Sequence, residues 1–468
     1  MTDSNQRHEP LGLIGFAMAT NTHLQPGLWQ SRSDRNPNWY GETQTWIDLA
    51  QLLDSAGFDA LFFADVIGLY GEYAGSHEIF ARHGLQIPTL DPSGLIPLLA
   101  NATQNLGFIV TSSILQEHPF TFARKLSSLD QWTNGRVGWN IVTGHNANAY
   151  RNFGYDDLVP HADRYNWAEE YLDVVYKLWE GSWDEDALVN DPKSSQFADA
   201  SKIHRINHVG ERYKVEGPHL VAPTRQRTPL LAQAGSSDRG QDFAAKHAEI
   251  VLLNAPNPEA AGRQVGSTAE RVRSAGRGDE EAKYFQTLSF IVGSTEAEAK
   301  RREAELDEHL DSEGTVAHFG GSIGIDLGLI GLDTPIESIE TEAVKSMLAS
   351  LLKQSAGRKP TVRDVIALRK RSRIVGTPEQ IADHILDWQN AGISGIAVTN
   401  SLIPDSFVDF IDHVLPTLRE RGLVRQLDHP AGQTLRGRVF GRDRLPQRHP
   451  AAMQRGAFAQ QSIGDPHA

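Results

Sequence analysis

The sequence contains no cysteine, and this absence removes several chemistries at once. Without thiols there are no disulfide bonds, no cysteine nucleophile, and no zinc or iron–sulfur site with cysteine ligands. Long apolar runs are also missing, since no stretch approaches the roughly 18 consecutive apolar residues of a membrane-spanning helix. The first residues, Met1–Pro10, are polar and lack the apolar segment of a signal peptide. We therefore expect a cytoplasmic protein that does not span a membrane.

Two nucleotide-binding signatures are absent as well. No GxGxxG motif occurs, because Gly276 and Gly278 are followed by Glu281 where a third glycine would be needed, and no Gly-Lys pair exists for a Walker A loop.

Lys and Arg number 45 against 59 Asp and Glu, which gives a formal net charge of −14. An acidic surface repels phosphate backbones and anionic lipids. Binding to nucleic acid or to a membrane surface is therefore not expected.

Short apolar segments alternate with amphipathic ones along most of the 468 residues. Such alternation predicts a parallel sheet covered by helices, and eight units fit a (β/α)₈ TIM barrel best. An open doubly wound sheet is the alternative, but no glycine-rich loop follows the first strand. The expected strands are Leu11–Ala19, Phe58–Ala64, Leu106–Ser113, Val137–Thr143, Pro229–Ala234, Glu249–Leu253, Phe285–Val292 and Gly395–Thr399.

Three segments fall outside the repeat. Gly144–Thr228 follows the fourth strand and contains an expected helix and a hairpin, His208–Val221. Glu308–Val375 follows the seventh strand, and Leu435–Ala468 forms a C-terminal arm on the barrel or on a second subunit. Insertions of this size usually lie at the C-terminal face of a barrel as lids, although dimer contacts are the alternative. We expect one domain over residues 1–468.

Functional residues of a barrel gather at the C-terminal ends of its strands. Asp65 ends the second strand, where it is either functional or a cap or ion-pair partner. Asn140 lies in an otherwise apolar strand, and a buried amide needs a ligand edge or water as partner. The segment Ala234–Gly240 (AGSSDRG) opens a helix directly after a strand, which suits either a phosphate or an ordinary N-cap.

Two other patterns are weaker than they look. Gly320–Gly324 (GGSIG) matches the GxSxG nucleophile motif around Ser322, but no apolar strand precedes it. His204 and His208 are spaced i, i+4, yet no third ligand is in view. We therefore predict no metal site.

Long stretches of the chain resemble one family. They include GRVGWNIVTGHNANAYRNFG (Gly135–Gly154), HADRYNWAEEYLDVVYKLWEGSW (His161–Trp183) and RTPLLAQAGSSDRGQDFAAKHAE (Arg227–Glu249), with further matches at Phe58–Tyr73, Val316–Leu327 and Val375–Ile385. These stretches are similar to two-component, FMN-dependent monooxygenases of the bacterial luciferase-like superfamily. The similar branch contains nitrilotriacetate monooxygenase component A, dibenzothiophene-sulfone monooxygenase and long-chain alkane monooxygenase. The resemblance covers nearly the whole chain and implies a single TIM barrel.

The resemblance also implies a site, position by position. Residues implied to contact FMN are Asp65, Thr111 and Asn140 around the isoalloxazine, Gly144 and His145 along the flavin chain, and Tyr165, Ser236 and Ser237 at the phosphate. Residues implied to act near the reactive edge of the flavin are His23, Tyr70, His145 and His318.

The reaction implied is oxygenation of a small organic substrate by O₂ through a flavin peroxide, with FMNH₂ supplied by a separate NAD(P)H:FMN reductase. His145 or His318 would hold or relay a proton. Thr20 stands where long-chain alkane monooxygenase has a cysteine, so an alkane is not the expected substrate. The resemblance implies a homodimer or homotetramer. Alternatives are a deazaflavin-dependent reductase or dehydrogenase of the same superfamily and a non-catalytic flavin-binding protein.

Overall fold

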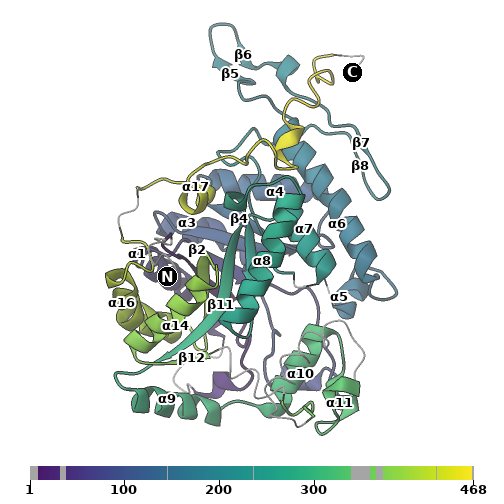
Figure 1. Cartoon of the computed structure of the whole chain (residues 1–468). Coiled ribbons are helices and arrows are strands. Elements are labelled where there is room, and N and C mark those ends of the chain that lie inside the picture. The colour runs from purple at the N-terminus through teal and green to yellow at the C-terminus, as the bar shows by residue number, and fades with distance from the viewer. Residues whose placement is uncertain are drawn as a thin grey trace.

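A computed structural model describes residues 9–31, 38–144, 146–235, 237–338, 359–364, 373–427 and 430–465. Eight parallel strands in these ranges close into a barrel, because β13 pairs with β1 and β10 pairs with β11 (Figure 1). The expected (β/α)₈ barrel is thereby confirmed. In order around the barrel the strands are β1 (Gly12–Met18), β2 (Ala60–Ala64), β3 (Gly107–Ser113), β4 (Val137–Val142), β9 (Leu230–Gln233), β10 (Ile250–Leu253), β11 (Lys283–Val292) and β13 (Gly395–Thr399). A further strand, β12 (Arg373–Gly376), pairs with the end of β11.

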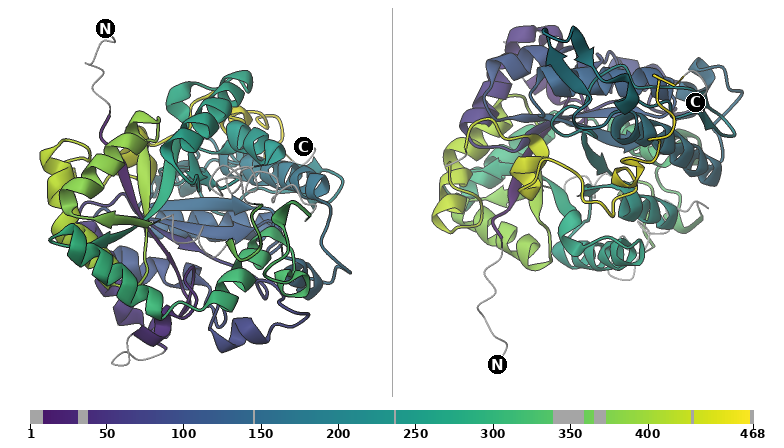
Figure 2. Two further views of the ribbon diagram at one scale, coloured as in Figure 1. Left: turned by 60° about the horizontal axis from the view of Figure 1, so that its bottom comes forward. Right: turned by 90° about the horizontal axis from the view of Figure 1, so that it is seen from above.

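Helices between the strands surround the barrel (Figure 2). In α1 (Thr43–Ser55) the buried residues Trp46, Leu49 and Leu53 recur at helical spacing, so one face of this helix packs on the sheet. The helix α14 (Pro378–Asn390) begins at a capping box formed by Thr377 and Gln380. The other helices of the outer layer are α3 (Ile96–Ala102), α4 (Pro119–Trp132), α6 (His161–Tyr176), α7 (Asp238–His247), α8 (Pro258–Ser274), α9 (Glu296–Glu308), α15 (Asp405–Asp409) and α16 (Leu415–Glu420).

Two separate apolar cores result from the alternation of side chains along each strand. Trp139 of β4 packs outward with Phe122, Tyr171 and Trp179 of the helical layer. The next residue along the strand, Asn140, therefore lies on the interior side. The barrel interior is filled by Ile14, Ala60, Phe62, Ile109, Leu230, Ala232, Ile250, Leu252, Phe285 and Ala397.

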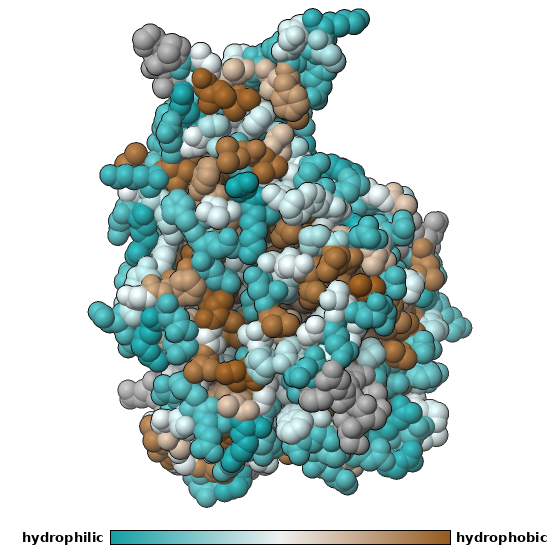
Figure 3. All heavy atoms as spheres, turned by 180° about the vertical axis from the view of Figure 1, so that it is seen from behind, coloured by the Kyte–Doolittle hydropathy of each residue, from teal (hydrophilic) through white to brown (hydrophobic). Residues whose placement is uncertain are grey.

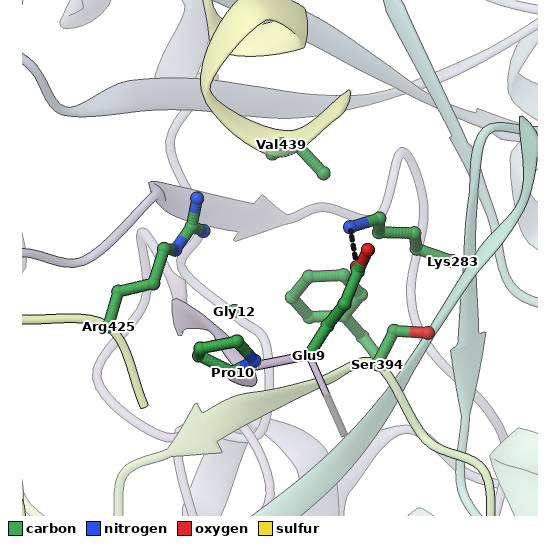
Figure 4. A pocket seen from close by; sticks show the side chains of 8 residues that line it. Glu9, Pro10, Gly12, Lys283, Ser394, Arg425 and Val439 are labelled. Carbon is green, nitrogen blue, oxygen red and sulfur yellow. Dashed lines mark hydrogen bonds and ion pairs between the residues drawn. The ribbon is translucent and has the colours of Figure 1, made fainter. Parts of the chain in front are cut away.

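The C-terminal arm closes the N-terminal mouth of the barrel. Its helix α17 (Leu435–Phe440) adds Leu435 and Val439 to the interior core. Arg436 is fully buried and its Nε lies 2.7 Å from Glu249 Oε1. A cavity of about 280 Å³ opens beside α17, where Lys283 Nζ lies 3.2 Å from Glu9 Oε2 (Figure 4). This cavity lies at the starts of β1 and β11, so it is opposite to the carboxyl ends of the strands.

The segment after β4 carries two antiparallel hairpins. The expected hairpin is present but short, with β7 (His208–Val209) paired to β8 (Lys214–Val215). A second hairpin of β5 (Leu188–Asp191) and β6 (Gln196–Ala198) was not expected. Both hairpins project from the barrel in Figure 1. Residues 461–465 lie beside the segment that connects them, because Ile463 N donates to Ile203 O at 2.8 Å. Between β4 and the hairpins lie α5 (Ala147–Asn152), α6 and a π-helical turn, Lys177–Gly181.

The segment after α9 packs against the loops that follow β1 and β2. It contains α10 (Ser312–Ile323) and α11 (Leu327–Ile330). The backbone N–H groups of Ala74 and Gly75 donate to Asp326 at 2.8 and 2.6 Å, and Asp311 N donates to Pro26 O at 2.9 Å. The loop after β2 also contains α2 (Glu78–Arg82). Of the helices described, none has both the length and the apolar character needed to cross a bilayer.

Candidate functional site at the carboxyl ends of the strands

A pair of polar residues lies next to the apolar interior of the barrel, toward the carboxyl ends of two neighbouring strands. Thr111 of β3 and Asn140 of β4 are register partners, and Asn140 Nδ2 donates to Thr111 Oγ1 at 2.9 Å. Both residues are buried, yet Asn140 Oδ1 has no hydrogen-bond partner among the residues that the structure describes. An unpaired buried acceptor costs free energy of about 1–3 kcal/mol, so this position is suited to a ligand that donates a hydrogen bond.

Asp65 follows β2 directly at the same end of the barrel. Burial raises the pKa of this carboxyl group from 3.8 to about 7, and the backbone hydrogen bond from Val66 N at 2.8 Å only partly opposes this effect. A carboxyl group with this pKa changes its charge near neutral pH. Asp65 is therefore able to accept or donate a hydrogen bond to a ligand, according to its protonation state.

The start of α7 forms a small cradle. Ser237 is the N-cap residue, and its Oγ accepts from Gly240 N at 3.1 Å. A Cβ atom on Gly240 would lie 2.9 Å from Tyr165 Oη and 3.0 Å from Ser237 Oγ, so glycine keeps this space open. A helix start with backbone N–H groups and hydroxyl groups is suited to an anion.

Three basic side chains that sequence reasoning missed lie around this cradle, namely His161, Arg164 and Arg239. Arg164 is buried and donates to Gly144 O, and its Nε has no partner within the described ranges. His161 Nε2 lies 3.4 Å from Ser237 Oγ. Burial, followed by the charges of Arg164 and Arg239, lowers the pKa of His161. The available signal was the spacing in HADRY, which places His161, Arg164 and Tyr165 on one side of the first turns of α6.

A second cluster joins the two loops after β1 and β2 to α10. The rings of Tyr70 and His318 stack with a centroid distance of 4.8 Å and an interplanar angle of 16°. Gln86 Nε2 lies 3.0 Å from His318 Nε2 and donates to His23 O at 3.2 Å. Since the amide nitrogen only donates, this contact favours the His318 tautomer that carries its proton on Nδ1. Gln86 thereby connects His23 to His318, and sequence reasoning did not identify it.

The ring of His23 continues an aromatic column that rises from the barrel interior. Phe16 stacks on Phe62 at 4.9 Å, and His23 stacks on Phe16 at 5.5 Å. The floor beneath this cluster is thus apolar and aromatic. A flat organic molecule would find stacking surfaces here and imidazole nitrogen atoms beside them.

The GGSIG stretch serves close packing. A Cβ atom on Gly321 would lie 2.7 Å from Tyr70 Cδ1, so the glycine lets α10 approach the ring. Ser322 is exposed on α10, and its Oγ donates to Phe319 O at 2.6 Å. This helical setting is not the strand-to-helix turn of a nucleophilic serine.

Hydrogen bonds tie the loop after β2 to the loop after β4. Leu69 N donates to Asn148 Oδ1 at 2.9 Å, and Asn146 Nδ2 donates to Leu69 O. Gly144 has a φ of +76°, and its carbonyl is held by Arg164 beside the cradle. The structure thus brings Gly144, Tyr165 and Ser237 together at one place, and His23, Tyr70 and His318 at another. His145 and Ser236 lie outside the described residues.

Other polar residues at the strand ends are used within the loops. Thr20 Oγ1 donates to Pro88 O at 2.7 Å, and Asn21 Oδ1 accepts from Trp39 Nε1 at 3.2 Å. Within the described part of the chain, no group of three or more His, Asp or Glu side chains is arranged to hold a metal ion.

Taken together, the donors suit an elongated ligand with an anionic end and a polar-edged ring. The cradle with its basic side chains would hold the anionic end, and Asn140 with Asp65 would face the ring. A TIM barrel with such a site has the features of a barrel protein that binds a cofactor or a nucleotide.

Comparison with known proteins gives the family. Residues 22–395 match the model of the luciferase-like monooxygenase family, which is more than half of the chain. The chain therefore belongs to this family, as the sequence predicted, and the expected enzyme class, a monooxygenase, is confirmed.

Two relatives are similar along almost their whole length. Dimethyl-sulfide monooxygenase of Hyphomicrobium sulfonivorans is 38% identical over 461 residues, which are 97% of this chain and 95% of the relative. Long-chain alkane monooxygenase of Geobacillus thermodenitrificans is 39% identical over 447 residues, or 94% and 97% of the two chains. The crystal structure of DmoA from Hyphomicrobium sulfonivorans superposes with a TM-score of 0.89 at 37% identity, covering 98% of this chain and all of that one.

Proposed function

We propose that this protein is the oxygenase component of a two-component, FMNH₂-dependent monooxygenase. A separate NAD(P)H:FMN reductase would supply FMNH₂ in the cytoplasm, and O₂ would be the oxidant. The overall reaction balances as substrate, FMNH₂ and O₂ giving the oxygenated substrate, FMN and water. When bound, the reduced flavin supplies two electrons and activates O₂. The substrate would be a small organic compound.

The observation that carries this proposal is the unpaired Oδ1 atom of Asn140. Because Nδ2 of the same amide is already bound to Thr111, the free acceptor position is fixed in direction. The isoalloxazine ring has an edge of alternating N–H and C=O groups, so it offers the donor that this acceptor lacks. Asp65, which changes charge near pH 7, would face the same ring.

The phosphate end is supported by the cradle at α7. Tyr165 and Ser237 supply hydroxyl donors, while Arg164 and Arg239 supply positive charge in an otherwise acidic protein. Gly144 and His145 would lie along the chain between ring and phosphate, and Ser236 would add a further donor to the phosphate. Charge-assisted hydrogen bonds of this kind contribute about 1.5–3 kcal/mol each to binding.

The cluster of His23, Tyr70 and His318 would act on the reacting side of the ring, together with His145. Gln86 Nε2 donates to His318 Nε2, so this imidazole would act toward a ligand through its protonated Nδ1, as a hydrogen-bond donor. Helices α10 and α11 would form a lid over this cluster, which keeps water from the reduced cofactor. The aromatic floor of Phe16 and Phe62 favours a substrate with an apolar part.

The chemical test is an anaerobic titration with FMNH₂, oxidised FMN and a reduced deazaflavin, followed by mixing with O₂. We expect tight binding of FMNH₂ and release of H₂O₂ much slower than from free FMNH₂. Release of H₂O₂ at the rate of free FMNH₂ would refute the oxygenase assignment. Preference for the deazaflavin would assign the protein to the reductase and dehydrogenase branch.

The site is tested by the double variant Ser237→Ala with Tyr165→Phe. If these hydroxyl groups hold the phosphate, FMNH₂ affinity should fall by about 1–3 kcal/mol. Ser322→Ala is the matched control, because Ser322 is an exposed serine on α10. Unchanged affinity in the double variant would remove the two residues from the site.

We also propose that the protein self-associates as a homodimer or homotetramer.

A further inference from the structure

The cavity at the N-terminal mouth of the barrel lies at the end opposite to the candidate functional site. Its volume of about 280 Å³ is just below the roughly 300–1,000 Å³ of typical small-molecule pockets. Its walls come from the segment before β1, the starts of β11 and β13, and helix α17. On the face drawn in Figure 3, hydrophobic residues lie in several groups among hydrophilic ones, as on most protein surfaces. The cavity differs from such a surface because it combines an apolar wall with two cationic side chains.

The inner wall of the cavity is formed by a fixed aromatic ring. Phe285 is fully buried, and a Cβ atom on Gly12 would lie 2.8 Å from its Cζ, so glycine lets the ring lie close to β1. Pro10 and Val439 add apolar surface from opposite sides of the cavity (Figure 4). An apolar wall of this kind suits the body of a small organic molecule.

Two cationic side chains, Arg425 and Lys283, lie on opposite sides of the cavity in Figure 4. Within the part of the chain that the structure describes, Arg425 uses two of its five N–H groups. Its Nη2 donates to Asp59 Oδ1 at 2.5 Å, and its Nη1 donates to Arg438 O at 2.7 Å. Lys283 Nζ has three N–H groups, and one oxygen of Glu9 lies 3.2 Å from it. Both cations therefore retain N–H groups that can donate to an anion.

Glu9 shows where an anion is held. Its main-chain oxygen accepts from Gln389 Nε2 at 3.0 Å, which fixes the segment before β1 against α14. Its side chain is 84% exposed, and among the described residues Lys283 is the partner of its carboxylate. An ion pair as exposed as this contributes little to stability. A carboxylate from solution can therefore replace that of Glu9 without disturbing the fold.

We propose that this cavity is a second ligand site, which binds a small carboxylate with an apolar body. The ligand carboxylate replaces that of Glu9 at Lys283, with Arg425 on its other side, while the apolar body lies against Phe285 and Val439. Charge-assisted hydrogen bonds and the burial of apolar surface both favour such a molecule. An inorganic oxyanion gains only the first of these, so it binds more weakly. The proposal goes beyond the oxygenase function and does not depend on it.

The test is a calorimetric titration of the full-length protein with benzoate, which carries a carboxylate on a flat apolar ring. We expect a dissociation constant of about 1 mM or lower. Benzamide, acetate and inorganic phosphate should each bind about tenfold more weakly or less tightly still, because each lacks either the charge or the apolar body. The midpoint of thermal unfolding should rise with benzoate concentration, since a ligand that binds only the folded protein stabilises it. Phosphate binding as tight as that of benzoate would show an adventitious anion site and overturn the proposal, as would the absence of benzoate binding.

Two variants of the ion pair give opposite expectations. Lys283→Met removes a cation, so the benzoate affinity should fall by about tenfold or more. Glu9→Gln removes the competing carboxylate, so the affinity should rise by about threefold or more. The matched controls are Lys300→Met and Glu296→Gln, which change the same charges in an exposed ion pair on α9. Both controls should bind benzoate like the unmodified protein. If circular dichroism shows that Lys283→Met does not fold, Glu9→Gln decides the test.

The outcomes separate this site from the flavin site. An anaerobic FMNH₂ titration with and without benzoate should give the same affinity, because the cavity lies at the other end of the barrel. Competition between benzoate and FMNH₂ would overturn the second site. A benzoate affinity that Glu9→Gln leaves unchanged, or that changes as much in the two controls, would overturn it as well. A protein that binds benzoate but not FMNH₂ would contradict the oxygenase assignment and leave this proposal standing.

Discussion

Replacing Asp65 by asparagine should make the stability of the protein less dependent on pH. The carboxyl group has a pKa of about 7 in the folded protein and an ordinary value of 3.8, chiefly because of burial. Such a carboxyl group contributes its full stabilisation of the folded protein only below pH 3.8. This contribution decreases as the pH rises from 3.8 and is lost once the pH has passed about 7. Asparagine keeps an oxygen atom for the hydrogen bond from Val66 N and has no charge to bury.

The magnitude follows from the size of the shift. From 3.8 to about 7, at 1.36 kcal/mol per pH unit, the ionised carboxylate costs about 4 kcal/mol of unfolding free energy at high pH. At pH 5 only the part between 3.8 and 5 has been lost, which is about 1.6 kcal/mol. The stabilisation of Asp65→Asn over the unmodified protein should therefore grow by about 2–3 kcal/mol between pH 5 and pH 8.

Urea unfolding at both pH values, followed by circular dichroism, measures this difference. Asp91→Asn is the matched control, because the Asp91 side chain is 64% exposed and lies near enough to influence Asp65. The control should change the unfolding free energy by less than about 0.5 kcal/mol at either pH. A stabilisation by Asp65→Asn that is the same at pH 5 and pH 8 would show that this carboxyl group does not titrate near neutrality.

Three further variants test other contacts. Gly240→Ala should weaken FMNH₂ binding at least tenfold in an anaerobic titration, because its Cβ would fill the cradle, whereas Gly266→Ala, with no atom within 4 Å of its Cβ, should bind normally. Gln86→Asn introduces a residue that tolerates the φ of +54°, but its shorter side chain weakens the contact with His318. The share of consumed O₂ that is released as H₂O₂ should therefore rise, while the FMNH₂ affinity should stay unchanged. Arg436→Met should lower the unfolding free energy by about 3–5 kcal/mol because it leaves Glu249 buried and unpaired, and Glu249→Gln added to it should restore most of the loss. Equal stability of the single and double variants would contradict the last prediction.

The strands of the barrel could be predicted because burial on both faces leaves a clear mark in the sequence. Each expected strand is a short apolar run, and the observed bounds differ from the expected ones by only a few residues, as for Gly107–Ser113 against Leu106–Ser113. The β5–β6 hairpin left no such mark. Its residues are largely exposed, so neither alternation nor an apolar run is present.

The candidate site was predicted in part. Asn140 stood out because it interrupts an apolar strand, and Ser237 because it precedes a helix directly after a strand. Gln86 carries no comparable signal, because its role depends on a left-handed backbone and on contacts with His318, which lies 232 positions along the chain. Arg164 was overlooked although it lies one turn from His161. Its relevance follows from where α6 packs against α7, and packing of this kind is a tertiary property that spacing does not reveal.

The position of α17 has a consequence for how the protein is made. The helix closes the barrel with Leu435 and Val439, and Arg436 reaches Glu249 from a point close to the end of the chain. The ribosome therefore synthesises all eight strands before the residues that seal their base exist. During translation Glu249 remains a carboxylate without its guanidinium partner, and the barrel mouth stays open. The barrel of this enzyme is thus sealed only once residues 435–439 have been synthesised, and a chain that terminates before residue 435 would have a full set of strands around an unsealed core.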